Sequence, residues 1–334
     1  MSTSTDSALH ELQKRPPHEF QDRPPHAFLH DPSLDLTIVI VSYNVRDLIV
    51  ECLESVRVTM HGLSFETIVV DNASTDGSAE AVRRRFTDVR VIESPSNLGF
   101  AAANNVAIRE SRGRFVLLLN PDTRILENRL PDDVCFIEER AGVGALGCRL
   151  VNPDGTPQPS CYRFPCLREV FGFYFGGPGS TGRSAVEGER ETRDVDFVRG
   201  AFMLLRRAAL ERTGALDERF FMYAEEADLC LRLKCSGWRT VYRPRTVVMH
   251  RRGKSAEQLP AEMFVQRMRS LVAYFRKHHA RQVPALRTLL FVGSLARVAA
   301  RLLPRGRRAR IPLAAHLSVI GLALGVDPGP PALH

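Results

Sequence analysis

The sequence predicts an α/β fold: a Rossmann-like, mostly parallel sheet flanked by helices, with a helical C-terminal extension. The first observation is a set of short aliphatic and β-branched runs, such as 36–42 (LTIVIVS), which are typical of strands buried on both faces. The second is that stretches of helical length separate these runs, which favours right-handed crossovers between parallel strands. The third is a change after about residue 256, where strand-like runs stop and helical patterns follow.

The first half of the chain alternates regularly between strand-like and helical patterns. We expect strands and helices in turn at 36–42, 46–60, 66–71, 77–86, 89–94, 100–111 and 114–120. Such alternation favours a single sheet with helices on both faces. No G-x-G-x-x-G follows the first strand, so the fingerprint of dinucleotide binding is absent.

The next part of the chain is less regular. Residues 152–165 are rich in turn formers, and 176–194 have the composition of a surface loop. Strand-like patterns return at 195–207 and 238–250. We therefore predict one domain over residues 35–256.

The two ends differ from this domain. Residues 1–34 contain the short repeat RPPHEF and RPPHAF and no apolar core of a signal peptide, so we expect a disordered arm and no export signal. Residues 257–334 are expected to be helical and are candidates for membrane association. Within them, 286–303 is apolar along its length with interspersed arginines, and the apolar run 313–326 is short for a bilayer span.

Composition limits the classes of partner. The 334 residues are 44% hydrophobic and 25% charged, as in a globular protein. A net charge of +8 and a pI of about 9.4 favour anionic partners such as phosphorylated substrates, nucleic acid or an acidic membrane surface. Seven cysteines without a C-x-x-C spacing are typical of small buried hydrophobes in a reducing compartment, so we expect a cytoplasmic protein.

Polar residues gather where the predicted strands end, which is where open α/β sheets bind ligands. In chain order these are Ser42, Tyr43, Asn44, Asp71, Asn97, Gly99, Asn104, Asn120, Asp122 and His250. Each alone also fits a turn, a helix cap or a structural histidine. Their recurrence at successive strand ends of one sheet favours a binding site.

A nucleoside diphosphate held through a metal ion suits these residue types. Asp122 offers an oxygen ligand and His250 a nitrogen ligand, a pair compatible with Mn²⁺, while Mg²⁺ would keep more water and phosphate ligands. Asp71 can accept the N–H of a pyrimidine base. Asn97 and the backbone at 98–100 can approach such a ligand closely.

Six segments, in this order, resemble family 2 glycosyltransferases of the GT-A fold, nearest to the bacterial rhamnosyltransferases. They read VIVSYN, VVDNASTDGS, NLGFAAANN, LLNPDT, GAFMLLRRAALERTGALDERFFMYAEEADLCLRLKCSGW and VVMHRRGKS. The likeness covers about residues 36–280, and the order and spacing are far more specific than any one motif. It implies inverting transfer of a sugar, with rhamnose as a candidate, from a nucleotide-sugar to an acceptor hydroxyl.

The resemblance also implies residue roles at the donor site. Asp71 contacts the base, and Asp122 takes the place of the last Asp in the metal-binding D-x-D. The first position of that motif is Asn120 here, a departure that this subgroup shares. His250 matches the late metal-binding His, so Mg²⁺ or Mn²⁺ is the implied cofactor.

The family's acidic pair falls on Glu225 and Glu226, whose second member supplies the general base. We therefore expect Glu226 to take the proton of the acceptor hydroxyl. Glu225 is the alternative, because the family has Asp where this chain has the longer Glu226. Asp228, on the same helical side as Glu225, is expected to orient the base or to bind a basic neighbour. A solvated acidic turn of a helix is the structural alternative.

A further segment, GTPQPSCYRFP, also resembles the rhamnosyltransferase-like group. By that resemblance Gln158, Ser160 and Arg163 line the sugar or acceptor site. A purely structural turn fits the same residues equally well.

Two other functions compete with sugar transfer. A nucleotidyltransferase normally has a Gly-rich, basic loop after its first strand, which VSYNVRD lacks. A non-catalytic sugar-nucleotide-binding protein is disfavoured by the intact acids and His250. Nucleic-acid binding is not expected, because the arginines interleave with apolar residues over 286–326, as suits an anionic membrane surface. We expect a peripheral protein at the inner face of the cell membrane, acting on a lipid-linked or other glycan acceptor.

Overall fold

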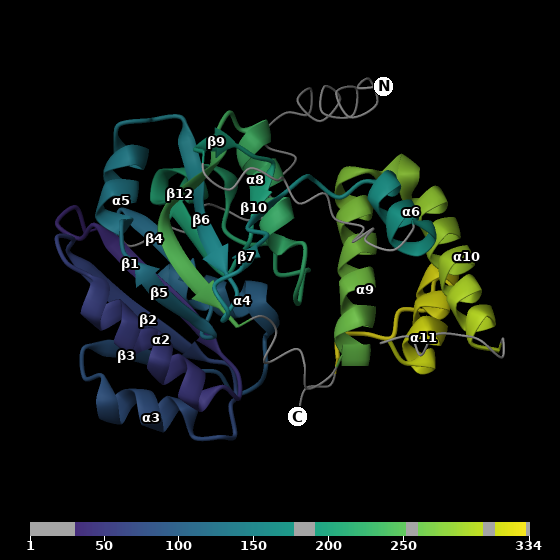
Figure 1. Ribbon diagram of the computed structural model, residues 1–334, viewed down its shortest axis with the longest axis horizontal. Helices are drawn as coiled ribbons and strands as arrows, with labels where there is room; N and C mark the ends of the chain where they lie inside the picture. The colour runs from purple at the N-terminus through teal and green to yellow at the C-terminus, as the bar shows by residue number, and fades with distance from the viewer. Residues whose placement is uncertain (1–30, 177–190, 252–259, 303–310, 332–334) are drawn as a thin grey trace.

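The computed structural model describes residues 31–176, 191–251, 260–302 and 311–331 (Figure 1). Most of the predicted N-terminal arm lies outside the described residues, as does the arginine-rich segment 303–310.

The first half has the predicted alternation. Its elements are β1 (Leu36–Ser42), α2 (Arg46–Thr59), β2 (Phe65–Asp71), α3 (Ser78–Arg85), β3 (Val89–Glu93), α4 (Gly99–Glu110) and β4 (Phe115–Leu119). β1 pairs in parallel with both β2 and β4, and β2 pairs in parallel with β3. The α/β class is therefore confirmed.

The remaining elements are more varied. They are β5 (Thr123–Glu127), α5 (Leu130–Glu138), β6 (Val143–Val151), β7 (Pro157–Gln158), β8 (Cys161–Tyr162), α6 (Leu167–Phe175), β9 (Arg193–Asp194), β10 (Phe197–Val198), β11 (Phe202–Arg206), α7 (Arg207–Thr213), α8 (Glu225–Cys235) and β12 (Arg239–His250). The C-terminal part consists of α9 (Pro260–His278), a 3-10 turn (Ala280–Gln282), α10 (Val283–Leu302) and α11 (Leu313–Leu324).

The main sheet has the order β3-β2-β1-β4-β11-β6-β12-β5. β11 runs antiparallel between β4 and β6, and β5 runs antiparallel at the edge beside β12. β12 is parallel to β6, so the predicted mostly parallel sheet is confirmed. The strand-like pattern over 195–207 forms two strands: the chain turns at Gly200, β11 joins the main sheet, and β10 pairs with β8 in a separate two-stranded sheet.

Both faces of the sheet are covered by buried apolar side chains. Ile38 and Ile40 of β1 point to one face and Val39 to the other, as the two-residue period of a strand requires. On the Val39 face the same apolar cluster continues into the C-terminal helices, through residues such as Phe264 and Leu290. Figure 1 shows α6, α9, α10 and α11 gathered beside the sheet, and this packing fixes them to it.

Candidate active site

The parallel strands bring the predicted donor-site residues to one edge of the sheet. Ser42 and Asp71 are the last residues of β1 and β2 and are register partners. Asp122 follows the end of β4, and His250 is the last residue of β12. Because these strands run in the same direction, their carboxyl ends form a common edge, as expected for a ligand site.

Asp71 presents a buried acceptor at this edge. Its Oδ2 accepts a hydrogen bond from the Ser74 amide at 3.0 Å, while Oδ1 is buried and accepts none. The Asn44 amide donates to Ser74 Oγ at 3.0 Å, so the loops after β1 and β2 hold each other. A buried carboxylate oxygen without a donor suits an N–H group of a ligand.

Three other predicted residues have structural partners near the start of α4. Asn97 Oδ1 accepts from the Gly99 amide at 2.9 Å and from Asn72 Nδ2 at 2.8 Å. Gly99 has φ +79°, and a Cβ there would lie 2.3 Å from the Phe221 carbonyl oxygen. Asn104 is buried and donates to the Phe100 carbonyl at 2.8 Å. These contacts shape the loop, so Gly99 is required by the neighbouring backbone whatever the ligand.

Asp122 and His250 face each other across a short gap. His250 Nε2 lies 3.3 Å from Asp122 Oδ1, and both side chains are buried. His250 Nδ1 lies 2.6 Å from Gln158 Oε1, while Gln158 Nε2 donates to the His250 carbonyl at 3.0 Å. The amide of Gln158 is thereby oriented with its oxygen toward the ring, which places the ring proton on Nδ1.

This pair fits a divalent cation. With a proton on Nδ1, Nε2 and the Asp122 carboxylate oxygen are free to act as two ligands directed at the same small space, where a cation could bind both. Asp122 Oδ1 and Asn120 Oδ1 are buried and accept no hydrogen bond. Within the described residues no three His, Cys, Asp or Glu side chains form a metal cluster. The protein would thus supply two main ligands, and the rest would come from phosphate and water.

The predicted general base lies just after a strained turn. Tyr223 (φ +71°) and Ala224 (φ +70°) are both left-handed although neither is glycine, at a cost of about 1–3 kcal/mol each. α8 begins directly afterwards with Glu225, which is buried. Glu226 is half-buried, and its Oε2 is buried without a hydrogen-bond partner.

Glu226 lines a pocket between the sheet domain and the C-terminal helices. The pocket is walled by β8, α6, the start of α8 and α9, with Arg163, Phe173, Tyr223 and Arg267 among its lining residues. Aromatic and aliphatic side chains make up most of the wall, and two arginines and two glutamates supply its charged groups. A carboxylate in such a pocket can accept a proton from a bound hydroxyl.

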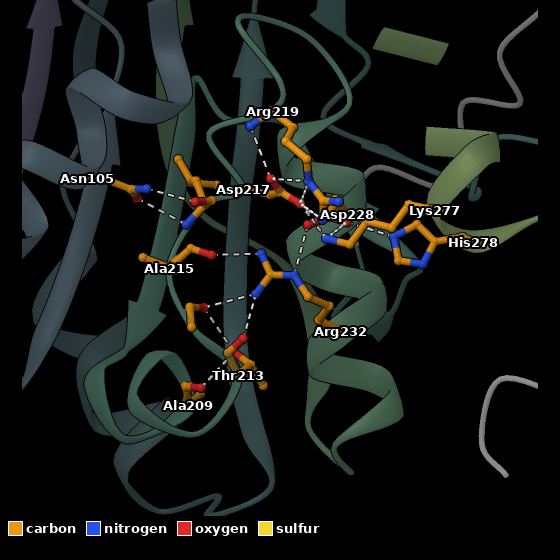
Figure 2. A network of polar contacts seen from close by, with 12 residues as sticks. Asn105, Ala209, Thr213, Ala215, Asp217, Arg219, Asp228, Arg232, Lys277 and His278 are labelled. Atoms are coloured by element: carbon orange, nitrogen blue, oxygen red, sulfur yellow. Dashed lines mark hydrogen bonds and ion pairs between the residues drawn. The ribbon is translucent and has the colours of Figure 1, made fainter. Parts of the chain in front are cut away.

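The structure places Asp228 in a buried network rather than in this pocket (Figure 2). Its carboxylate contacts Arg232 Nε at 2.8 Å, Lys277 Nζ at 2.6 Å and His278 Nε2 at 2.6 Å. Burial alone would raise the pKa of Asp228, but these three groups outweigh it and the pKa lies well below its ordinary value. The carboxylate of Asp228 is therefore held by protein groups and is not placed to contact a substrate. The basic neighbours expected for it are Arg232 and Lys277.

Of the three residues predicted for the acceptor site, the structure brings one to the pocket. Arg163 is exposed and lines it. Gln158 instead supports His250, and Ser160 Oγ accepts from the Leu150 amide at 3.2 Å. Sequence patterns miss the contribution of α9, because it joins the pocket only through packing between residues far apart in the chain.

The chain is similar in sequence to known proteins. A sequence model described as glycosyl transferase family 2 matches residues 37–214. The chain is 30% identical over 230 residues to an N-acetylglucosaminyl-diphospho-decaprenol L-rhamnosyltransferase of Mycobacterium tuberculosis, covering 64% of this chain and 75% of the relative. It is 27% identical over 221 residues to the rhamnosyltransferase WbbL of Escherichia coli, covering 64% of this chain and 82% of that protein.

Solved structures share the fold. The mannosyltransferase PcManGT of Pyrobaculum calidifontis, solved with GDP-Man and Mn²⁺, superimposes with a TM-score of 0.53 at 23% identity, over 97% of this chain and 89% of that one. TarS of Staphylococcus aureus gives a TM-score of 0.51 at 17% identity, over 88% of this chain and 49% of that one. At such identities the likeness establishes the GT-A fold of the chain.

Proposed function

The chain belongs to glycosyl transferase family 2, and from this premise we propose that it transfers a sugar, with rhamnose the first candidate, from a nucleoside-diphosphate donor to an acceptor hydroxyl with inversion. The observation that carries the proposal is a series of contacts that connects the donor-site residues at the strand ends with the segment that carries Glu226. The side chain of Asn72, the neighbour of Asp71, accepts a hydrogen bond from the backbone amide of Leu98 at 2.9 Å. The backbone amide of Phe100 donates to the carbonyl of Phe221 at 2.6 Å, five residues before Glu226.

The residues divide the reaction between them. Asp71 would accept a hydrogen bond from the base of the donor, and Asp122 with His250 would hold its diphosphate through Mg²⁺ or Mn²⁺. A bound cation would neutralise the charge that builds on the departing diphosphate. Glu226 takes the acceptor proton as the acceptor oxygen bonds to the anomeric carbon, while the bond from that carbon to the diphosphate breaks.

The pocket beside Glu226 supports a lipid-linked acceptor. Its apolar wall includes Phe173, Met268 and Leu271, which suits an acceptor sugar joined to an apolar chain. The Mycobacterium tuberculosis relative is named for an acceptor that carries decaprenol. We therefore place the acceptor in this pocket.

The C-terminal helices support contact with a membrane, which we propose to be at its cytoplasmic face. Among the described residues, one helix, Ala280–Ala300, is long and apolar enough to cross a bilayer, with a mean hydropathy of 1.4. A core helix passes the same test, but only 22% of that window is buried. Exposed apolar residues on α6, α10 and α11, such as Phe171 and Leu317, favour peripheral contact with anionic lipid.

The test is a panel of UDP-, GDP- and dTDP-sugars incubated with the full chain and Mn²⁺ or Mg²⁺. We expect one donor to release nucleoside diphosphate faster with a polyprenyl-diphosphate-linked sugar acceptor than without it. Tight donor binding without any release would favour the non-catalytic alternative. Release of pyrophosphate from a nucleoside triphosphate and a sugar phosphate would favour a nucleotidyltransferase.

A further inference from the structure

The segment that carries Glu226 is attached to two different helices through neighbouring carbonyl groups. The Phe221 carbonyl accepts a hydrogen bond from the Phe100 amide at the start of α4, at 2.6 Å. The next carbonyl, that of Met222, accepts from Ser270 Oγ of α9 at 2.7 Å. Residues 221–222 therefore connect α4, at the expected donor site, with α9 of the C-terminal part.

The contact from α9 is made by two buried polar side chains, Ser270 and Gln266, which also hydrogen-bond to each other. Ser270 and Gln266 lie one helical turn apart, and each is 2% exposed. Gln266 Nε2 donates to Ser270 Oγ at 2.9 Å and also reaches the Met222 carbonyl at 3.4 Å. Neither side chain lines the pocket, so neither is placed to contact a substrate.

A second contact between α9 and α8 lies on the other side of the glutamates. Lys277 and His278, at the end of α9, both reach the Asp228 carboxylate at 2.6 Å (Figure 2). Met222 and Asp228 thus bracket the strained residues Tyr223 and Ala224 and the two glutamates. Left-handed backbone at residues with a Cβ persists only where the surroundings fix it.

We propose that Ser270, supported by Gln266, is a positioning residue that holds Glu226 in its reactive orientation from α9. The inference rests on the proposed function, because it takes Glu226 to be the general base. Its consequence is that the C-terminal helices belong to the catalytic unit. A misplacement of about 1 Å at a reacting group can lower a rate by about 10²-fold, so loss of one buried contact has a measurable effect.

The experiment compares Ser270→Ala with a matched control, Ser294→Ala. Ser294 is also a fully buried serine of the C-terminal helices, and its hydroxyl lies 3.2 Å from Tyr174 Oη, away from the Glu226 segment. We expect Ser270→Ala to lower kcat for donor turnover about tenfold or more, with KM for the donor within about twofold. Ser294→Ala should shift the melting temperature by a similar amount and leave kcat unchanged. Equal kcat in the two variants would overturn the proposal.

A double-mutant cycle separates positioning from general destabilisation. If Ser270 acts through Glu226, the loss caused by Ser270→Ala should shrink to about twofold or less in a Glu226→Gln background. An undiminished loss in that background would show a structural role and refute the inference. Should Ser270→Ala fail to fold, Gln266→Met removes the supporting donor while keeping the side-chain volume, and the same cycle is run with it.

Failure of the proposed function has a different signature. If Glu226→Gln turns over the donor at the wild-type rate, the base assignment fails. The comparison of Ser270→Ala with Ser294→Ala then decides alone whether α9 positions this segment. If Glu226→Gln is impaired and Ser270→Ala is not, the function stands and the positioning role is wrong.

Discussion

Single atoms mark the site most clearly. Asp71 Oδ1, Asn120 Oδ1, Asp122 Oδ1 and Glu226 Oε2 are all buried without a hydrogen-bond partner in the described structure. An unsatisfied buried polar group costs about 1–3 kcal/mol, and more if it is charged. Three of these atoms lie at the ends of parallel strands and the fourth belongs to Glu226, which lines the pocket, so a bound ligand can offset the cost at each of them.

Glu226→Gln tests the base directly. The amide keeps the shape of the side chain and removes its basicity, so we expect turnover to fall by roughly 10²–10⁴-fold. Binding of the nucleoside diphosphate, measured by calorimetry, should stay near the wild-type value. Glu225→Gln is the matched variant at the neighbouring carboxylate: if it carries the loss while Glu226→Gln is near normal, the base is Glu225.

Asp122→Ala tests the metal assignment. We expect Asp122→Ala to lose the increase in nucleotide affinity that Mn²⁺ gives the wild-type protein. Calorimetric titration of Mn²⁺ into each protein in the presence of UDP or dTDP measures this difference. Gln158→Leu, which leaves both ligands but frees the His250 ring, should weaken metal binding by about 10- to 100-fold. Asp47→Ala, at an exposed position of α2, is the charge-matched control. Wild-type metal affinity in Asp122→Ala would contradict the assignment.

At the scale of elements, α9 makes buried polar contacts with α8. Asp228 meets Lys277 and His278 of α9 in the interior, where desolvation makes an incomplete network costly. Arg232 extends the network by donating to the carbonyls of Thr213 and Ala215 at 2.7 Å each (Figure 2). α8 is thereby connected both to the end of α7 and to the end of α9.

This part of the molecule should respond to acid. Burial lowers the pKa of His279 to about 4, and burial also lowers the pKa of His278 against the opposing bond to Asp228. An unfolded histidine titrates near 6.5, so between about pH 6.5 and 4 the unfolded chain binds protons that the folded chain does not. The contribution of His279 to stability therefore falls as the pH drops through this window, by at most about 1.4 kcal/mol per pH unit. Burial raises the pKa of Asp133 to about 6, which acts in the opposite sense, so the comparison with a His279 variant isolates the histidine.

Urea unfolding at pH 7.5, 6.5 and 5.5 measures this slope. His279→Phe keeps an aromatic ring beside Tyr274 and Phe275 and should flatten it, leaving the variant relatively more stable at pH 5.5. His61→Ala removes an exposed imidazole elsewhere and should retain the wild-type slope. A slope that is the same in His279→Phe and wild type would refute the assignment.

The sequence predicted the elements whose signal is local. β1 and β4 are continuous aliphatic runs buried on both faces. Because parallel strands end at the same edge of a sheet, the polar residues at their carboxyl ends could be placed together from the strand order alone. β6, with two glycines in nine residues, lacks such a run and was not predicted. The pairing of Gln158 with His250 across 92 positions, and the contribution of α9, depend on tertiary packing that no local pattern encodes.

On the scale of the whole molecule, α6 and the C-terminal helices together have two faces with different surroundings. Leu286, Leu290 and Val319 are fully buried in the cluster shared with the sheet. Phe171 and Phe175 of α6 and Val292 and Leu295 of α10 are exposed by 41–55%. Removal of residues 284–334 would therefore open the core, and membrane contact is better tested by surface substitutions.

We expect the full chain to float with liposomes that contain anionic lipid at low salt and to be released as salt rises, because cationic residues contribute about 1 kcal/mol each near such a surface. Phe171→Ser with Phe175→Ser should weaken binding at least about tenfold, since each ring would otherwise bury apolar area in the headgroup boundary. The matched control is Val58→Ser with Leu126→Ser, two exposed apolar side chains on α2 and β5. Equal loss in the control pair would show non-specific adsorption, and wild-type protein that stays soluble at low salt would favour a soluble acceptor. Retained flotation in the control, with donor hydrolysis intact in both pairs, would place α6 at the membrane surface, beside the pocket that Glu226 lines.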